Sequence, residues 1–332
     1  MLTTAVQFSA PRTVELIDIE LTSPTEGQAL VRSLYSGISG GTEMLAYRGE
    51  IDPALPLDET LGALSGTFSW PFRYGYSVVG RIEESSCFLS PGSTVFCFHP
   101  HQAHVVAEGT EIIEVDGLEP RLATLLPLVE TALQISLDAG PVAHQQVVVL
   151  GLGAVGILAG ALLGLAGATV LGSDPLPWRR AVAESFSVSS VDPAELPAQV
   201  ADLTEGRGVP LVVEASGNPA VLAGVLELTA HEGMVLVASW FGTKPVSLPL
   251  GAAFHRRRLT LRSTQVSTIP ARLTPAWTRK RRLETALNLM RELPLQRLAT
   301  HEFPLSQVST AFSAVDSPSD GLIHAALSYQ EV

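Results

Sequence analysis

A glycine-rich turn follows the apolar run VVVL and has the spacing that nucleotide binding requires. Gly151, Gly153 and Gly156 form the pattern GxGxxG between a strand-like segment and a helix-like one. The first glycine permits a tight turn, the second lets the backbone approach a pyrophosphate, and the third lets the helix pack on the strand. Free N–H groups at the start of the helix favour phosphate. The sequence therefore predicts a dinucleotide site at the turn Gly151, Leu152, Gly153, Ala154, Val155 and Gly156.

An acidic residue at the end of the next apolar run completes this pattern. Asp174 closes the run ATVLGSD. A carboxylate here accepts hydrogen bonds from the ribose hydroxyls of the adenosine half and repels a 2′-phosphate. The sequence therefore favours NAD(H) over NADP(H). Arg179 and Arg180 follow closely and could instead hold a 2′-phosphate, so NADP(H) stays open as an alternative.

The pattern of apolar and turn-forming residues changes near residue 118. Before it, short alternating runs such as QALVRSLYSG are broken by glycine, proline and serine, which is typical of β-strands. After it, strands alternate with helices, as in a doubly wound parallel sheet. The sequence thus predicts an α/β protein with a small barrel-like β domain at 1–118, a Rossmann dinucleotide-binding domain at 119–266 and a return segment at 267–332.

Composition excludes several classes of protein. The chain has 332 residues, 46% of them hydrophobic, and a net charge of −12, which argues against nucleic-acid binding. Its two cysteines, Cys87 and Cys97, cannot form a four-cysteine zinc site. No signal peptide is recognisable, so we expect a cytoplasmic protein. The uncharged run 147–172 is long enough to span a bilayer, but its glycines and its strand–turn–helix order favour a buried start of the Rossmann domain.

The order of these domains, with the runs SGISGGTE, FHPHQ, VETAL, SWFG and FHRRRLTLRSTQV, resembles the medium-chain dehydrogenase/reductase superfamily. Within it, the chain is similar to the zinc-type alcohol dehydrogenase-like branch that includes bacteriochlorophyllide dehydrogenase. The resemblance covers essentially the whole chain. It implies a GroES-like catalytic domain that the return segment completes. It also implies that two strand ends face the cofactor, through Ala215, Ser216, Gly217, Ser239 and Trp240.

The same resemblance shows where a catalytic zinc ion would be held. Ser39 stands where the family has a cysteine ligand, and Tyr76 stands where it has a histidine, in the turn Gly75-Tyr76-Ser77. Glu130 corresponds to the acid at the domain junction. A serine hydroxyl and a phenol bind Zn²⁺ poorly at neutral pH, because each must first lose a proton from a high pKa. We therefore expect no zinc.

Several residues could replace the metal if the resemblance holds. Tyr76 could hydrogen-bond the substrate oxygen or could only fill the vacated space, and both interpretations stay open. Thr42 and Glu43 match the hydroxyl and the acid of the family turn, although SGGTE is one residue longer than that turn. His101 is the preferred proton shuttle, because only histidine titrates near neutrality. Glu130 could orient another group or carry a raised pKa.

Together these features predict a zinc-independent, NAD(P)-dependent oxidoreductase that transfers hydride between nicotinamide and a hydroxyl or carbonyl compound. One alternative is a reductase of an activated C=C bond. Another is a cofactor-binding sensor or scaffold without catalysis. The family often joins Rossmann sheets edge to edge, so we expect a homodimer through the last strand of that sheet, near residues 234–248.

Overall fold

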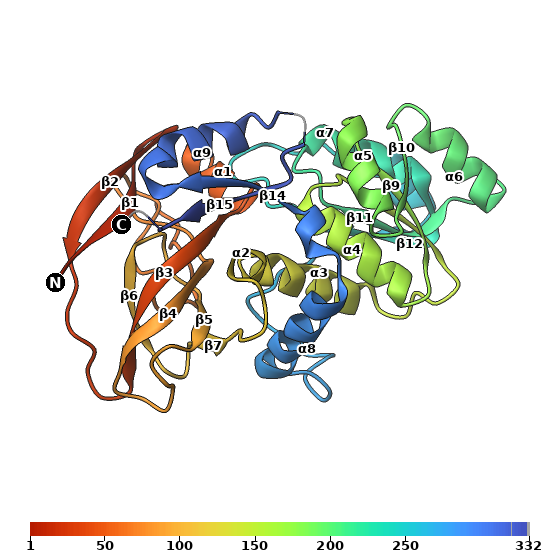
Figure 1. Cartoon of the computed structure of the whole chain (residues 1–332). Coiled ribbons are helices and arrows are strands. Elements are labelled where there is room, and N and C mark those ends of the chain that lie inside the picture. Colours follow the sequence, from red (N-terminus) through yellow and green to blue (C-terminus); the bar gives the residue numbers. More distant parts are fainter. Residues whose placement is uncertain (320, 331–332) are drawn as a thin grey trace. The chain divides into compact units, whose positions relative to one another are not determined.

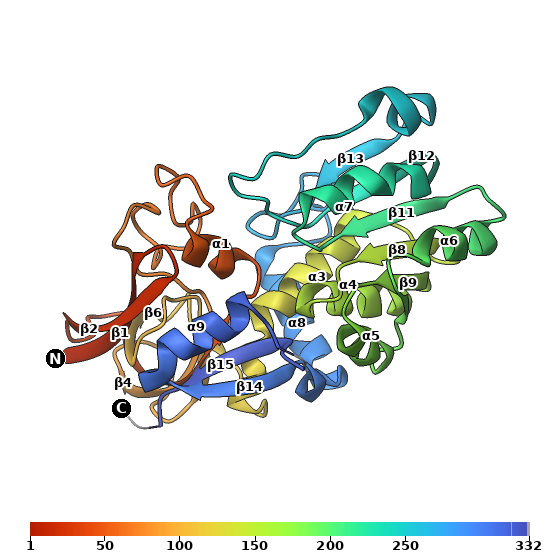
Figure 2. The ribbon, with the colours of Figure 1, turned by 90° about the horizontal axis from the view of Figure 1, so that it is seen from above.

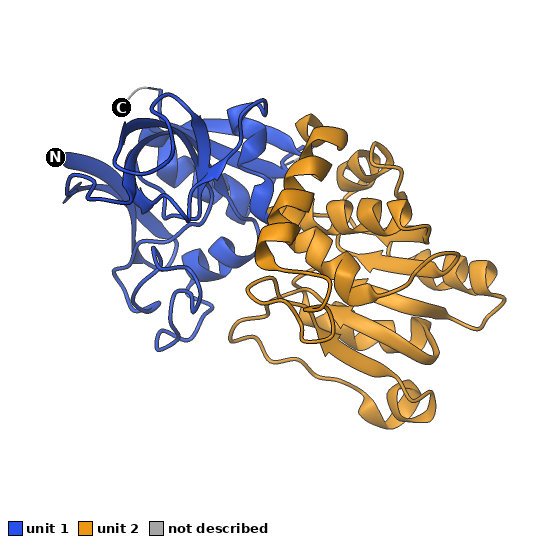
Figure 3. Cartoon of the chain, turned by 90° about the horizontal axis from the view of Figure 1, so that it is seen from below, with its two compact units in different colours: residues 1–127, 298–332 blue, residues 128–297 orange. Residues whose placement is uncertain are grey.

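The computed structural model describes residues 1–319 and 321–330, which form two compact units. The first unit comprises Met1–Pro127 and Leu298–Val332, and the second comprises Leu128–Arg297 (Figure 3). The chain thus leaves the first unit, builds the second and returns. The boundaries expected from the sequence, after residues 118 and 266, lie earlier along the chain than these.

The first unit is organised around β3, the longest strand of its seven-stranded sheet (Figure 1). β3 pairs with β4 on one side, and with β6 and then β15 on the other. β1 and β2 form a separate antiparallel pair. The strands are β1 (Leu2–Ala10), β2 (Thr13–Glu20), β3 (Gln28–Ile38), β4 (Val78–Ser85), β5 (Thr94–Cys97), β6 (His104–Glu108), β7 (Ile113–Glu114), β14 (Ala299–Pro304) and β15 (His324–Ser328).

An aromatic core supports this unit. Phe8 stacks on Phe72 with ring centroids 5.2 Å apart, and the edge of Phe312 meets Phe8 at 5.3 Å. Phe312 lies on α9, which contacts β2, β14, β15 and α1 (Figure 1). Tyr76 packs against the same buried cluster. The helices of this unit are α1 (Thr42–Arg48), α2 (Pro120–Ala123) and α9 (Val308–Asp316).

The second unit is a doubly wound Rossmann sheet, as predicted. Its six parallel strands lie in the order β10-β9-β8-β11-β12-β13, and the strand order reverses between β8 and β11 (Figure 2). Ligands of such sheets bind at the carboxyl ends of the strands beside this reversal. The strands are β8 (Gln146–Leu150), β9 (Thr169–Ser173), β10 (Ser189–Val191), β11 (Val209–Glu214), β12 (Thr229–Val237) and β13 (Thr260–Ser263). The helices are α3 (Leu126–Ala139), which begins in the first unit, α4 (Ala154–Leu165), α5 (Pro177–Glu184), α6 (Leu196–Thr204), α7 (Pro219–Gly224) and α8 (Arg279–Glu292).

The long uncharged run 147–172 folds into β8, α4 and β9 rather than into one continuous helix. The valines of β8 are buried because a parallel strand in such a sheet is covered on both faces. α4 is 12 residues long and packs on β8 and β9. Among residues 1–319 and 321–330, no helix has the length and apolar character needed to cross a membrane.

The expected free edge of the Rossmann sheet was placed on the wrong strand. β12 covers the start of the region 234–248, and it is hydrogen-bonded on both sides, to β11 and to β13. β13 is therefore the outer strand at this end. Its residues lie in the run RLTLRSTQV, whose pattern already indicates a last strand of this sheet.

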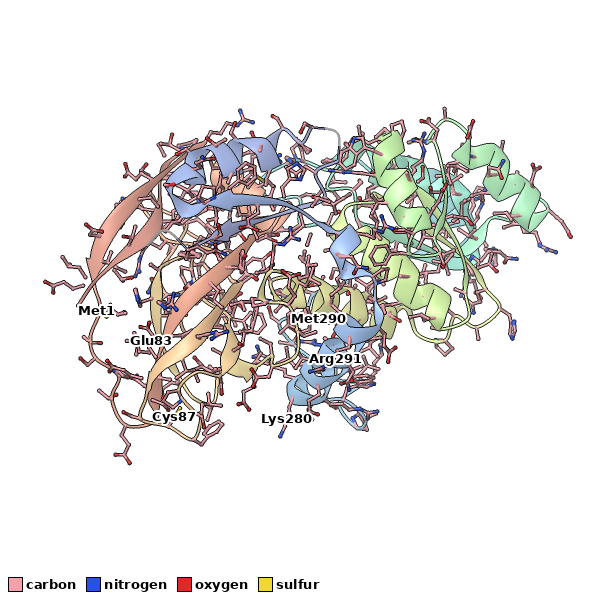
Figure 4. All side chains as sticks on the ribbon, in the orientation of Figure 1. Met1, Glu83, Cys87, Lys280, Met290 and Arg291 are labelled. Atoms are coloured by element: carbon pink, nitrogen blue, oxygen red, sulfur yellow. The ribbon has the colours of Figure 1, made fainter. Side chains whose placement is uncertain are left out.

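α8 belongs to the second unit because one of its arginines is buried there. Arg282 is 1% exposed and donates hydrogen bonds to Glu130 Oε1 at 2.9 Å and Gln134 Oε1 at 2.5 Å, both on α3. Met290 is also buried, whereas Lys280 and Arg291 are exposed (Figure 4). The basic run that contains Arg282 is thus partly structural, and α8 is not part of the returning segment.

Candidate functional site

The glycine turn after β8 has the geometry of a phosphate-binding loop. Gly151 has a φ of +87°, and a Cβ atom there would lie 2.5 Å from Ser216 Cα. A Cβ atom on Gly156 would collide with the Gly151 carbonyl oxygen. At Gly153, by contrast, no described residue beyond its immediate chain neighbours has an atom within 4 Å of an added Cβ. Glycine is therefore required at the first and third positions for packing, and at the second it leaves open space that a ligand could fill.

Asp174 is built into this turn. The side chain is 2% exposed, and it follows β9 directly. Its Oδ2 accepts a hydrogen bond of 2.9 Å from the Leu152 backbone N–H, and its Oδ1 accepts one of 2.9 Å from Leu176. The Asp174 carboxylate, which was expected to bind the ribose, thus also stabilises the glycine-rich turn. A carboxylate offers about four lone-pair sites, so acceptor capacity remains for a ribose hydroxyl.

The two arginines beyond Asp174 are engaged differently. Arg180 donates to the Asp174 carbonyl oxygen at 2.7 Å and to Asp192 at 3.3 Å. The Arg179 guanidinium lies 3.5 Å from Asp174 Oδ2 and over the Trp178 ring. Of the pair, Arg179 therefore keeps more of its donor capacity for a ligand.

The other cofactor-facing residues cluster at the carboxyl ends of neighbouring strands. Ala215, Ser216 and Gly217 follow β11, and Ser239 and Trp240 follow β12. Ser239 Oγ accepts a hydrogen bond of 2.8 Å from the Gly217 N–H, which joins the two turns. Trp240 is 42% exposed. Ala154 and Val155 begin α4, so their N–H groups lie at the free end of the helix.

Three buried polar atoms at this edge have no hydrogen-bond partner among the described residues. They are Ser173 Oγ, Glu214 Oε2 and Arg179 Nε. Ser173 and Glu214 are the last residues of β9 and β11. Buried polar groups are normally paired, so these atoms await water or a polar ligand. Together with the open space at Gly153, they fit a nicotinamide dinucleotide. Sequence analysis missed Glu214, although an acid that ends the apolar run LVVE was a visible signal.

In the first unit, Tyr76 meets the hydroxyls of Ser39 and Thr42. Burial raises the pKa of the Tyr76 phenol above its usual range, and the nearby Glu43 carboxylate adds to this rise. Hydrogen bonds with Ser39 and Thr42 act in the opposite direction on that pKa. Tyr76 therefore stays a neutral phenol at physiological pH and can donate a hydrogen bond.

Glu43 and His101 form a buried pair behind these hydroxyls. Both side chains are 0% exposed, and His101 Nε2 lies 2.8 Å from Glu43 Oε2. Glu43 Oε1 accepts a hydrogen bond of 2.9 Å from the Ser39 backbone N–H. The pair thus anchors the turn that carries Ser39 and Thr42. His101 has no direct access to water in the described structure, so a proton can reach it only through its neighbours.

The Gly75-Tyr76-Ser77 turn is shaped around His101. Gly75 has a φ of +120°, and a Cβ atom there would lie 2.6 Å from the His101 ring. Ser77 turns away from Tyr76 and donates a hydrogen bond of 2.7 Å to the Thr124 carbonyl oxygen. The turn therefore packs directly against the His101 ring through Gly75.

Two further polar residues extend from His101, Ser36 in direct contact with it and Tyr329 in contact with Ser36, and neither was expected from the sequence. Ser36 Oγ lies 2.7 Å from His101 Nδ1 and 2.8 Å from the Tyr329 hydroxyl. Ser36 is an ordinary strand position, and Tyr329 lies 293 residues further along the chain. No local pattern signals either residue.

Glu130 differs from the other residues expected to take part in catalysis because it belongs to the second unit. Burial raises its pKa, and the Arg282 guanidinium, 2.9 Å away, opposes that rise. It is thus the ion-pair partner of Arg282, rather than an acid with an open coordination position. Two other histidines near this region, His99 and His104, contact the Pro100 carbonyl oxygen and Thr3 respectively.

The residues in the zinc positions do not fit a zinc ion. Ser39 offers a neutral hydroxyl, Tyr76 offers a phenol with a raised pKa, and Glu130 is already paired. Zinc prefers thiolate, imidazole and free carboxylate ligands. Over residues 1–319 and 321–330, no three His, Cys, Asp or Glu side chains gather closely enough to bind a metal ion.

Comparison with known proteins identifies relatives over nearly the full length. The family model described as zinc-binding dehydrogenase matches residues 154–281. The 2-desacetyl-2-hydroxyethyl bacteriochlorophyllide A dehydrogenase of Cereibacter sphaeroides is 27% identical over 97% of both chains. The L-threonine 3-dehydrogenase of Pyrococcus furiosus is 33% identical, over 69% of this chain and 73% of that protein.

Solved structures share the fold at lower identity. A short chain alcohol dehydrogenase from Escherichia coli CFT073, in complex with NADH, has a TM-score of 0.78 and 14% identity over 99% of both chains. A candidate zinc-binding dehydrogenase from Sinorhizobium meliloti 1021, bound to NADP, has a TM-score of 0.76 and 18% identity over 99% of this chain and 100% of that one. The fold, and with it the expected fold class, is confirmed.

Proposed function

This chain belongs to the medium-chain dehydrogenase/reductase superfamily of NAD(P)-dependent oxidoreductases, and from that premise we propose that it transfers hydride without zinc. Its substrate is a hydroxyl compound in one direction and the corresponding carbonyl compound in the other. The observation that supports this proposal is the contact of the Tyr76 phenol with the hydroxyls of Ser39 and Thr42. By the family resemblance, Ser39 and Tyr76 correspond to two metal ligands.

The proposed chemistry assigns the stabilisation of the substrate oxygen to Tyr76. When bound, the nicotinamide supplies or accepts the hydride. Tyr76 donates a hydrogen bond to the substrate oxygen, and this bond strengthens as negative charge develops there. The raised pKa of its phenol keeps the donating hydrogen in place. Ser39 and Thr42 orient the phenol, the Glu43–His101 pair holds their turn, and the proposal assigns the relay of the proton to His101.

A panel of possible acceptors tests this proposal. Purified protein with NADH or NADPH is offered ketones, aldehydes and activated alkenes, and oxidation of the cofactor is followed by absorbance. Turnover of carbonyl compounds supports the proposal. Turnover of activated alkenes alone would favour the C=C reductase. Tight cofactor binding without turnover of any compound would favour the sensor or scaffold.

We predict that NAD(H) binds at least about tenfold more tightly than NADP(H), because placing like charges together at a binding site costs several kilocalories per mole. Asp174 supplies the repelling charge. Asp174→Ala should reduce the difference in affinity between NAD(H) and NADP(H). Asp174→Asn should reduce it as well, with less disturbance of the hydrogen bond to the Leu152 N–H. Calorimetry measures both affinities, with Asp192→Asn as the matched control. Tighter binding of NADP(H) to the unmodified protein would reverse the assignment and point to Arg179.

We also propose a homodimer, now through β13 as the outer strand of the Rossmann sheet. An outer strand presents unpaired N–H and C=O groups that a second copy can pair. Light scattering at micromolar concentration should give twice the mass of the chain. A monomer mass under these conditions would contradict this expectation.

A further inference from the structure

Behind the candidate site, four buried side chains form a continuous hydrogen-bonded line. Tyr329 contacts Ser36 at 2.8 Å, Ser36 contacts His101 at 2.7 Å, and His101 contacts Glu43 at 2.8 Å. We propose that Ser36 and Tyr329 are positioning residues that hold His101 in the tautomer with its hydrogen on Nε2. This inference deepens the proposed function and rests on it for its catalytic consequence.

The line is sealed from solvent, so its hydrogens must be shared among its own members. Ser36, His101 and Glu43 are 0% exposed, and Tyr329 is 2% exposed. A buried donor or acceptor left without a partner costs about 1–3 kcal/mol. The arrangement in which every hydrogen meets an acceptor is therefore strongly favoured.

The direction of the line is set at Glu43. Its Oε1 accepts from the Ser39 backbone N–H, and a carboxylate offers only acceptors, so Oε2 needs a donor from His101 Nε2. In a neutral ring Nδ1 is then an acceptor. Ser36 donates its hydroxyl hydrogen to Nδ1, and Tyr329 donates its own to Ser36 Oγ. Each hydrogen is used once, and all of them point toward Glu43.

The opposite tautomer would leave two polar groups without a suitable hydrogen-bond partner. With the hydrogen on Nδ1, the lone pair of Nε2 would face the Glu43 carboxylate, acceptor against acceptor. Ser36 Oγ would then accept from Nδ1–H, so either the Ser36 or the Tyr329 hydroxyl hydrogen would have no acceptor among the partners that the described structure gives them. Ser36 and Tyr329 thus make one tautomer complete and the other incomplete.

The consequence for the site passes through Glu43. A carboxylate that is held by Nε2–H stays aimed at the Ser39 N–H, and so keeps the turn with Ser39 and Thr42 beside Tyr76. Ser36 and Tyr329 are brought together by the pairing of β3 with β15, in which Leu327 lies opposite Ser36. Tyr329, in the returning part of the chain, thereby orients Ser36 on β3.

Nitrogen-15 NMR of the imidazole rings tests the tautomer directly in the full-length protein, with His101→Gln to assign the signal. In the unmodified protein, His101 should show a hydrogen-bearing Nε2 and a lone-pair Nδ1. Ser36→Ala and Tyr329→Phe should mix the two tautomers, and Ser36→Thr should retain the native one. Tyr35→Phe is the matched control, since that hydroxyl lies one position away and contacts Gln330 instead.

Kinetics give the second measurement. Ser36→Ala should lower kcat about 10–100-fold, as losses of orienting partners do, while KM and cofactor affinity stay nearly unchanged. Ser36→Thr should restore most of the rate. A His101 ring protonated only on Nδ1 in the unmodified protein, or a native tautomer that persists in Ser36→Ala, would overturn the proposal. An intact Nε2–H tautomer in a protein that turns over no substrate would sustain the positioning and refute the proposed function instead.

Discussion

Replacing Tyr76 with phenylalanine should lower kcat by about 10²–10³-fold, the usual cost of losing one donor to a developing oxyanion. The substitution removes a single hydroxyl and keeps the ring that packs on the aromatic core. Cofactor affinity should stay within about twofold. Tyr76 belongs to the first unit, whereas the Gly151–Gly156 turn belongs to the second. Steady-state kinetics and calorimetry measure the two quantities on the same preparation.

Tyr74→Phe is the matched control for this experiment. Tyr74 belongs to the same turn, is buried, and meets the Tyr76 ring edge-on at 6.2 Å. Removing its hydroxyl should change kcat far less. If Tyr76→Phe instead turns over at the native rate, Tyr76 only fills the space of the absent ligand, and Ser39 or Thr42 becomes the candidate donor.

The second large effect is expected at His101. His101→Ala should lower kcat by at least about a hundredfold, within the range for loss of an acid–base group. It should also lower the free energy of unfolding by about 3–5 kcal/mol, because the Glu43 carboxylate would remain buried without its partner. Denaturant unfolding and turnover report these two losses separately.

A double variant separates the charge effect from the chemistry. Combining His101→Gln with Glu43→Gln removes the buried charge and leaves two groups that can hydrogen-bond each other, so stability should largely recover. Turnover should not recover. A native rate in either His101 variant would show that the proton travels by another route.

The Rossmann half of the fold was predictable because its signals are local. The first strand, the turn at Gly151 and the acid at Asp174 all lie within one short stretch of chain. Steric or electrostatic requirements of dinucleotide binding explain each of them. The sheet and the packing of these glycines agree with that prediction. The free edge of the sheet was misplaced at residues 234–248, although the run RLTLRSTQV, which contains β13, was already expected to form a strand.

The candidate site was harder to predict because its contacts join distant parts of the chain. Tyr76, Thr42, Glu43 and His101 were named from the family resemblance, and their catalytic roles remain predictions. The pairing of Glu130 with Arg282 spans 152 residues, and that of Ser36 with Tyr329 spans 293. No periodicity or motif encodes such pairs. The Ser36–Tyr329 pair follows from the return of the chain to its first unit. Both pairs also follow from the need to satisfy buried polar atoms.

If this oxidoreductase works without zinc, an active preparation should contain almost none of the metal. Zinc per chain and turnover are measured on the same sample, before and after treatment with a strong chelator. An established zinc-containing alcohol dehydrogenase, treated in parallel, controls for the removal of metal. We expect full turnover with far less than one zinc per chain. Turnover that falls with the zinc content, and returns when zinc is added back, would contradict the account.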